Sequence, residues 1–348
     1  MSNQASWIPA ATQTVSVGPA DTYTPGPGEL LVKINSIAFT PIEGKIQKFG
    51  TRPIPYPNIL GTSFSGTVES VGEGVTGFEK GDHVVSIRSG KTLGDPRFGG
   101  YQKLALAPAS STSKISKSVP FHSASATILN LAAITSALSI HLGLDRPSLS
   151  GTASPKGKKV LIYGGSSSCG GLAVKYAATA GYEVITTSSN RNKEFVQSLG
   201  PAHIIDHEQK PEDVVAELKK YGPYEAVLDT IGLPGPTAIL IEYFESLGGG
   251  SYNSMIPPIP GTREIPDNVK RSFAPYNFAF DEPEHKPFAQ WLYNEYLPQG
   301  LESGLIIPTR QHVLTGGLEK AQEALDLMNE GGVSGKKLVM DPWESPSA

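Results

Sequence analysis

The sequence predicts an α/β protein in which a β-rich domain is followed by a doubly wound parallel sheet with helices on both faces. Three observations support this fold class. Short strand patterns separated by Pro/Gly turns fill the chain up to about residue 125. Strand and helix patterns alternate from Val160 onward, which is typical of a parallel sheet. Residues 158–187 read as strand, glycine-serine loop, helix and strand, and they predict a complete βαβ unit.

The N-terminal half is predicted to contain mostly strands. Strand patterns lie on both sides of the turn Thr24–Gly28. Alternating small and branched residues at 59–72 and the glycine-led segment 81–86 predict two more strands. The apolar run 124–144 has a helical pattern that Ser, Thr, Asn and His residues interrupt. We therefore expect a buried helix there rather than a membrane span.

The C-terminal half is predicted to alternate between helices and strands. Helices are expected at residues 172–180, 212–221, 237–247 and 318–328. Strands are expected at residues 160–163, 183–187, 204–205, 226–229, 249–254, 269–280 and 336–340. The segment 269–280 is rich in aromatic residues, and we expect it near an edge of the sheet.

The loop at residues 164–171 is the predicted binding site for a nucleotide phosphate. Gly165 and Gly170 fit the first and last glycines of a G-x-G-x-x-G pattern, and Ser167 occupies the middle position. Backbone N–H groups at a helix N-terminus bind anions, and the helix dipole adds to this attraction. The flanking strand and helix and the second strand strengthen the interpretation. The alternative is a glycine turn that binds no ligand.

The residues after the second strand predict which dinucleotide binds. A cofactor with a free ribose 2′-hydroxyl requires an acid at the end of that strand. Here residues 188–193 contain no acid, and Glu194 is the first one. The hydroxyls, Arg191 and Lys193 suit a 2′-phosphate, because a guanidinium can donate two hydrogen bonds to phosphate. We therefore expect NADPH rather than NADH; the alternative is an ordinary solvated turn.

Composition excludes several classes of protein. The 348 residues suggest about two domains, and a formal net charge of −4 provides no basic excess for binding nucleic acid. Cys169 is the single cysteine, so the chain can form neither an internal disulfide nor a multi-cysteine metal site. The N-terminal residues show no secretory signal. We expect a cytosolic protein.

A series of short motifs runs along nearly the whole chain, at residues 25–33, 41–45, 59–68, 81–84, 164–170, 199–206, 229–232 and 331–339. In this order they resemble the medium-chain dehydrogenase/reductase superfamily, in its zinc-independent, quinone-oxidoreductase-like branch. Within that branch the sequence is most similar to fungal oxidoreductases that include the trans-acting enoyl reductases of polyketide pathways.

The resemblance implies a domain organisation and binding partners. A GroES-like catalytic domain would comprise residues 1–125 and 290–348, and a Rossmann domain residues 126–289, with NADPH in the cleft between them. The substrate would be a small molecule or an acyl chain, and a polyketide synthase would be a partner. The protein would be a monomer or a homodimer. No nucleic acid and no membrane is expected as a partner.

The resemblance also assigns site residues. Lys45 matches a lysine near the nicotinamide, where it would anchor the ribose or stabilise an enolate, and Glu43 would fix it by ion pairing. Thr135 matches a threonine beside the nicotinamide. The alternatives are a surface lysine and a threonine bonded to its own helix. Both residues are expected to be catalytic and to contact the cofactor. The other expected cofactor contacts are Gly164, Gly165, Ser166, Ser167, Ser168, Cys169, Gly170, Ser189, Asn190, Arg191, Lys193, His207, Thr230 and Ser334.

Two of these positions depart from the family pattern. His207 stands where relatives have a Tyr against the adenosine phosphate. Cys169 stands where they have a small apolar residue, so we expect packing there rather than an activated thiol.

No metal site is expected. The positions of the zinc ligands in zinc-dependent relatives correspond to Thr40 and Gly61–Phe64, which carry no ligand pair. Only His203 and His207 stand four residues apart, and they flank a predicted strand end rather than share a helical face.

Hydride transfer without a metal suits an acceptor that is already activated. A double bond conjugated to a carbonyl accepts hydride at its β-carbon, and a hydrogen-bond donor stabilises the enolate. The leading hypothesis is an NADPH-dependent reductase of such double bonds, as in enoyl reductases of fungal secondary metabolism. A quinone oxidoreductase and a nucleotide-binding protein without turnover remain alternatives. The missing acid after the second strand argues against a methyltransferase.

Overall fold

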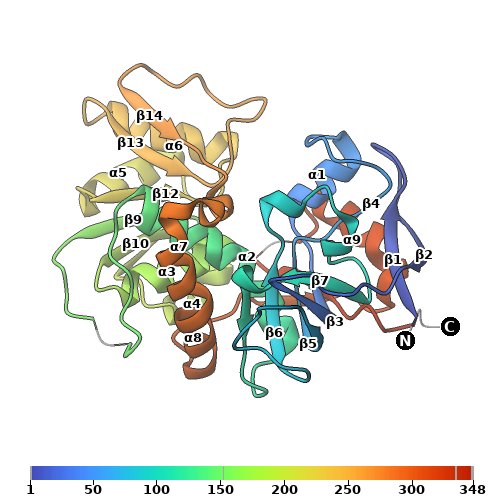
Figure 1. Ribbon diagram of the computed structural model, residues 1–348. Coiled ribbons are helices and arrows are strands. Elements are labelled where there is room, and N and C mark those ends of the chain that lie inside the picture. The colour runs from blue at the N-terminus through green and yellow to red at the C-terminus, as the bar shows by residue number, and fades with distance from the viewer. Residues whose placement is uncertain (1, 152, 334, 346–348) are drawn as a thin grey trace. The chain divides into compact units, whose positions relative to one another are not determined.

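The computed structural model describes residues 2–151, 153–333 and 335–345 (Figure 1). Contacts within the chain divide it into two compact units. The described residues of Met1–Leu129, Phe280–Gly304 and Pro308–Ala348 form unit 1, and those of Asn130–Ala279 and Leu305–Ile307 form unit 2. The chain therefore enters unit 2 within a helix and returns to unit 1 at residue 280.

Unit 2 is built on a sheet in which every neighbouring pair of strands is parallel. The strand order is β11 (His203–Asp206), β10 (Glu183–Ser188), β9 (Lys159–Tyr163), β12 (Ala226–Asp229), β13 (Gly250–Ser254) and β14 (Val269–Ser272). From β9 the chain adds two strands on one side, β10 and β11, and then three on the other, β12, β13 and β14, so the sheet is doubly wound as predicted. Such sheets bind ligands at the carboxyl ends of the strands, where the direction reverses.

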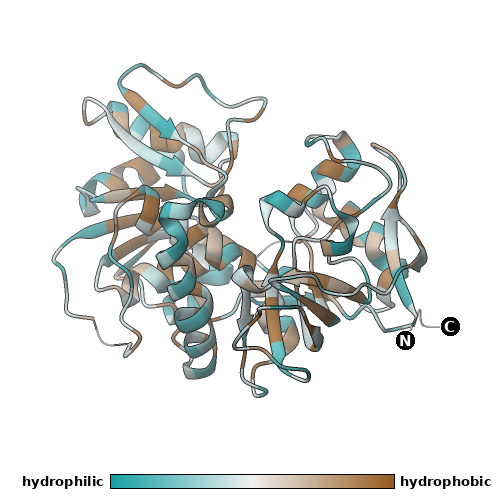
Figure 2. Ribbon diagram, viewed as in Figure 1, coloured by the Kyte–Doolittle hydropathy of each residue, from teal (hydrophilic) through white to brown (hydrophobic). Residues whose placement is uncertain are grey.

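Helices connect the strands of unit 2 and cover its sheet. They are α3 (Ser168–Thr179), α4 (Lys193–Ser198), α5 (Pro211–Tyr221) and α6 (Pro234–Glu245). The short helix α4 is missing from the sequence-based expectation. Leu161, Ile185 and Val227 are buried between helices and strands, and Figure 2 shows that apolar residues concentrate on the inner strands.

The strand predicted at residues 269–280 is only partly correct. The structure places β14 at the edge of the sheet, as expected, but the strand ends at Ser272. Residues Tyr276–Asp281 form a 3₁₀ helix instead. The sequence contains Pro275 between the two elements, and proline cannot donate to a strand ladder, which explains the early end.

Unit 1 contains a larger, mainly antiparallel sheet and a smaller one. The order in the larger sheet is β15 (Gln311–Val313), β16 (Lys337–Met340), β3 (Glu29–Ala38), β5 (Ser63–Val71), β6 (His83–Ile87) and β8 (Thr112–Lys114), with β7 (Leu104–Pro108) also paired to β3. The smaller sheet has the order β2 (Ser16–Ala20), β1 (Asn3–Ile8) and β4 (Asn58–Ile59). The pairing of β16 with β3 brings the C-terminal segment back onto the N-terminal one.

Two helices of unit 1 pack closely at Gly44. Helix α1 (Pro41–Phe49) lies against α9 (Ala321–Asn329), and Asn329 Nδ2 donates a hydrogen bond of 3.2 Å to the Gly44 carbonyl oxygen. A Cβ atom at Gly44 would lie 2.8 Å from Asn329 Oδ1. A larger residue at position 44 would therefore displace the Asn329 side chain, which bonds α9 to α1.

A long apolar helix joins the two units in sequence. Helix α2 (Phe121–Thr135) continues as a π-helical turn, Ser136–His141. By length and composition Phe121–His141 is the one helix among the described residues that could cross a membrane, but 78% of its most apolar window is buried inside the protein. A core helix passes the same test, so this observation is weak evidence for a membrane span.

Three consecutive helical segments follow the short 3₁₀ turn Pro283–His285, after the chain has rejoined unit 1. They are α7 (Lys286–Trp291), a π-helical turn (Leu292–Tyr296) and α8 (Leu297–Ser303). Helix α8 packs against β8. The sequence-based expectation contains no helix here.

Candidate cofactor and catalytic site

The glycine loop connects β9 to α3. Residues with a Cβ atom would not fit at its glycine positions. A Cβ atom at Gly165 would lie 2.3 Å from Thr186 Oγ1, and one at Gly170 would lie 2.0 Å from the Gly164 carbonyl oxygen. Gly164 itself has a φ of +91°, in the region that favours glycine. The loop therefore turns tightly enough to bring the start of α3 against the end of β9.

Ser167, at the middle position of the glycine pattern, caps α3. Its Oγ accepts a hydrogen bond of 2.9 Å from the Gly170 N–H, which satisfies a donor of the first helical turn. The same Oγ lies 2.9 Å from Thr230 Oγ1, and Thr230 donates 2.8 Å to the Tyr163 carbonyl oxygen. The predicted contacts Ser167 and Thr230 are thus brought together, at the ends of β9 and β12.

Thr187 supports the same loop from β10. The Gly164 N–H donates 2.8 Å to Thr187 Oγ1, and the Gly165 N–H donates 2.9 Å to the Thr187 carbonyl oxygen. The sequence pattern identifies Thr187 only as a strand residue. A threonine at the end of a strand beside a glycine loop is the signal that could have identified it. The Gly164 and Gly165 N–H groups donate to Thr187 and are therefore unavailable to a ligand, so a phosphate at this loop would use the remaining N–H groups.

The predicted binding site for the 2′-phosphate lies after β10. Ser188 and Ser189 are buried, whereas Asn190, Arg191 and Lys193 are exposed. Residues Asn190–Asn192 form a 3₁₀ turn that leads into α4. Hydroxyls, an amide and two cations are close in sequence here, and this donor set fits a phosphate. A shallow open depression along α4 adjoins the turn, lined by Asn190, Lys193, Glu194, Gln197 and Ser198.

The structure adds to this region an acid, Asp206, that was not among the residues predicted from the sequence. Ser188 pairs with Asp206 in the parallel register of β10 and β11, and Asn190 Nδ2 donates 2.6 Å to Asp206 Oδ2. The His207 N–H donates 3.3 Å to the Ser188 carbonyl oxygen, so exposed His207 lies at the same edge. The available signal was an acid at the end of the next predicted strand.

Helix α1 carries Lys45 and is fixed by the buried carboxylate of Glu43. Glu43 Oε1 accepts 2.6 Å hydrogen bonds from the Thr62 N–H and from Thr62 Oγ1. Its Oε2 accepts 2.8 Å from the Thr40 N–H and 2.6 Å from the Tyr101 hydroxyl. Four donors from three segments therefore hold the first turn of α1.

The expected ion pair between Glu43 and Lys45 is wrong. The oxygens of Glu43 are occupied by Thr40, Thr62 and Tyr101. Residues two positions apart on a helix also point to different sides. Lys45 is half-buried and belongs to no ion pair within the described parts of the chain.

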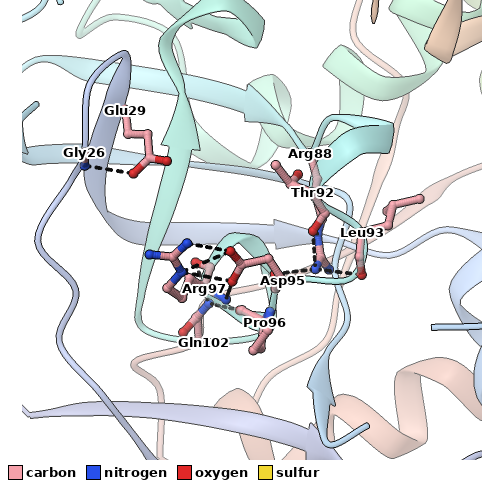
Figure 3. A network of polar contacts seen from close by, with 9 residues as sticks. All are labelled: Gly26, Glu29, Arg88, Thr92, Leu93, Asp95, Pro96, Arg97 and Gln102. Carbon is pink, nitrogen blue, oxygen red and sulfur yellow. Dashed lines mark hydrogen bonds and ion pairs between the residues drawn. The ribbon is translucent and has the colours of Figure 1, made fainter. Parts of the chain in front are cut away.

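A buried arginine fixes the loop that precedes Tyr101 (Figure 3). Arg88 donates to four carbonyl oxygens, those of Ile59, Thr92, Leu93 and Asp95. Burial lowers the pKa of Arg88 to about 10, and the negative charges of Asp95 and Glu43 act in the opposite direction. The guanidinium therefore stays charged near neutral pH and bonds these four carbonyl groups together.

Thr135, Lys45 and Cys169 belong to three different helices. Thr135 belongs to unit 2, where its side chain is buried and its Oγ1 donates 3.1 Å to the Ala132 carbonyl oxygen of the same helix. Lys45 belongs to unit 1. Cys169 is half-buried in the first turn of α3. Ser334 lies outside the described residues.

The positions that match zinc ligands in relatives carry hydroxyl groups. Thr40 Oγ1 and Ser63 Oγ are buried side-chain atoms without a hydrogen-bond partner among the described residues. Zinc sites in proteins use thiolate, imidazole or carboxylate ligands. The described residues contain no group of three or more His, Cys, Asp or Glu side chains that could hold a metal ion.

Known proteins are similar to this chain in sequence over nearly its whole length. The family model "Alcohol dehydrogenase GroES-like domain" matches residues 26–117. The trans-enoyl reductase himH of Aspergillus japonicus is 32% identical, and the match covers 97% of each chain. The dehydrogenase orsE of Emericella nidulans is 30% identical, and the match covers 97% of this chain and 99% of the relative.

Solved structures share the fold. An alcohol dehydrogenase superfamily protein from Novosphingobium aromaticivorans has a TM-score of 0.78 at 22% identity, covering 97% of this chain and 99% of the other. A quinone oxidoreductase from Pseudomonas syringae has a TM-score of 0.73 at 21% identity, covering 98% and 100%. A mycobacterial protein solved in complex with NADPH has a TM-score of 0.71 at 22% identity, covering 98% and 100%.

Proposed function

Because this chain belongs to the medium-chain dehydrogenase/reductase superfamily of oxidoreductases, we propose that it is an NADPH-dependent reductase of carbonyl-conjugated double bonds. The observation that carries the proposal is the fixed first turn of α1. Four hydrogen bonds to Glu43 hold a turn that presents the half-buried Lys45. The relative named as a trans-enoyl reductase, 32% identical over 97% of this chain, supports the same activity.

The residues of unit 2 fit a dinucleotide with a 2′-phosphate. The capped N-terminus of α3 would hold the pyrophosphate, because its backbone donors and dipole favour an anion. Ser189, Asn190 and Arg191 would hold the 2′-phosphate through neutral and charged hydrogen bonds. When bound, NADPH supplies the hydride. The fold neighbour solved with NADPH supports this cofactor.

Lys45 would act on the substrate or on the cofactor ribose. As an enolate forms on the substrate, a lysine ammonium at its oxygen would stabilise the negative charge. Alternatively, Lys45 would donate to the ribose and orient the nicotinamide. Because Glu43 is bonded to other groups, Lys45 keeps its charge available for either role. We propose that Thr135 contributes to positioning the nicotinamide, and that the α-proton comes from a side chain or water.

The proposed substrate is a small molecule or an acyl chain that contains the conjugated double bond. The fungal relatives similar over the full chain support a role in secondary metabolism. On this basis we also propose that a polyketide synthase supplies the substrate.

A substrate panel with deuterium-labelled NADPH tests the function. Purified protein is incubated with α,β-unsaturated thioesters, enones and quinones, and products are analysed by mass spectrometry and NMR. We expect saturated products carrying one deuterium at the β-carbon. Reduction of quinones alone would replace the proposal with a quinone oxidoreductase. NADPH binding without oxidation by any acceptor would indicate a binding protein without turnover.

A further inference from the structure

Asp206 stands beside the turn that carries Arg191, although the two residues are far apart in sequence. It is the last residue of β11 and pairs with Ser188, the last residue of β10, in parallel register. The 3₁₀ turn Asn190–Asn192 begins two residues after Ser188. The carboxylate therefore lies at the carboxyl ends of β10 and β11, where the proposed 2′-phosphate site also begins.

Both oxygens of Asp206 are held in place. Oδ2 accepts a 2.6 Å hydrogen bond from Asn190 Nδ2, and Oδ1 accepts a 3.0 Å hydrogen bond from the Glu208 N–H. Both donors are uncharged groups, so they orient the carboxylate without neutralising it. Asp206 is half-buried, and its charge is therefore less screened by solvent than that of a fully exposed acid.

We propose that Asp206 is a second determinant of cofactor choice, whose fixed negative charge opposes the attraction of Arg191 for the 2′-phosphate. The inference rests on the NADPH site of the proposed function. The charged groups of this edge are Arg191 and Lys193, which attract a phosphate, and Asp206, Glu194 and Glu208, which repel it. Among the three acids, Asp206 is the one bonded to the turn itself. The preference for NADPH over NADH would then depend on the balance between these attractive and repulsive charges.

The substitution Asp206→Asn separates charge from position. An asparagine side chain keeps an oxygen that can accept from Asn190, but it removes the negative charge. Asp206→Ala removes both the charge and the hydrogen bond to Asn190. A gain in phosphate affinity in both variants would assign the effect to charge.

Glu183→Gln is the matched control. Glu183 is exposed at the amino end of β10, and Asp206 pairs with the residue at the carboxyl end of that strand. Five residues of strand separate the two ends by about 17 Å, beyond the screening length at physiological salt. Asp206→Asn and Glu183→Gln change the net charge by the same amount, so the two variants differ only in where the negative charge is removed.

The experiment measures binding of 2′,5′-ADP and 5′-AMP to the full chain by isothermal titration calorimetry. Neither probe contains nicotinamide, so the result does not depend on reduction of any substrate. We expect Asp206→Asn to tighten 2′,5′-ADP about three- to tenfold at low salt while 5′-AMP stays within about twofold. The gain should shrink at high salt, and Glu183→Gln should behave as the wild type.

Three other results would each overturn the inference about Asp206. Unchanged affinity for 2′,5′-ADP in folded Asp206→Asn and Asp206→Ala proteins would overturn the inference and leave the proposed function intact. An equal gain for 5′-AMP would overturn it as well, because the effect would then not concern the 2′-phosphate. Failure of every variant to bind 2′,5′-ADP would overturn the NADPH site together with this inference.

Discussion

The hydroxyl of Tyr101 donates a 2.6 Å hydrogen bond to Glu43 Oε2, and both side chains are buried in unit 1. Burial and the charge of Glu43 raise the pKa of Tyr101 well above its usual value, so the phenol keeps its proton and remains a donor. The bond joins the first turn of α1 to the segment before β7, which are 58 residues apart. The position of Lys45 therefore depends on a contact that lies outside its own helix.

Replacing Tyr101 with Phe should destabilise the protein. The change leaves one oxygen of a buried carboxylate with one donor fewer, and a hydrogen bond to a charged group contributes about 1.5–3 kcal/mol. The free energy of unfolding, measured by urea denaturation, should fall by about this amount. Tyr56→Phe is the control, because Tyr56 is partly exposed and is not among the donors to Glu43. Equal stability of the two variants would contradict the role of the bond.

Replacing Gly170 with Ala should weaken NADPH binding. The new methyl group would lie 2.0 Å from the Gly164 carbonyl oxygen, so the loop must move away from α3. Gly235→Ala in α6 is the control, because a Cβ atom there has no neighbour within 4 Å. Binding is measured by fluorescence titration of NADPH. A Gly170→Ala protein that binds NADPH as tightly as the wild type would show that the loop is not the phosphate site.

Replacing Lys45 with Ala should impair the reaction in one of two distinguishable ways. Loss of a donor to the enolate should lower kcat by about 10²–10³, whereas loss of a ribose contact should mainly raise the apparent KM for NADPH. Lys48→Ala, at an exposed position on the same helix, is the control. Steady-state kinetics with a confirmed substrate measure both constants. Unchanged kinetics would leave Lys45 as an ordinary surface lysine.

Replacing Arg191 with Ala should weaken NADPH but not NADH. Only NADPH carries the 2′-phosphate, and one charge-assisted contact is worth about 1.5–3 kcal/mol, or about ten- to a hundredfold in affinity. Dissociation constants for both cofactors are compared with those of Lys219→Ala, at an exposed position on α5. An equal loss for both cofactors would exclude a specific contact to the 2′-phosphate.

The protein should not depend on zinc. Thr40 and the segment Gly61–Phe64 supply hydroxyl groups and a phenylalanine ring where zinc would need thiolate, imidazole or carboxylate. Metal analysis of protein purified without added zinc should find far less than one zinc per chain, and chelators should not reduce turnover. Stoichiometric, tightly bound zinc would show that this interpretation is wrong.

The sequence by itself determined the features that depend on neighbouring residues. An apolar run bounded by glycine predicted β9, and a run of β-branched residues predicted β10, because strand patterns arise from local burial and turn residues. The glycines 165 and 170 predicted the loop, and the structure shows that space at the loop requires them. The doubly wound sheet followed from the alternation of elements, because parallel strands need crossover helices.

Only the tertiary structure decided which distant side chains meet. Glu43 looked like a partner for Lys45 in the sequence, but its carboxylate binds Thr62 and Tyr101, from segments that fold against α1. Asp206 has no assigned role in the sequence-based prediction, and it is the parallel register that places it beside Ser188. A hydrogen bond needs two groups within about 3 Å, and no local pattern reports that distance for residues separated by many turns of the chain.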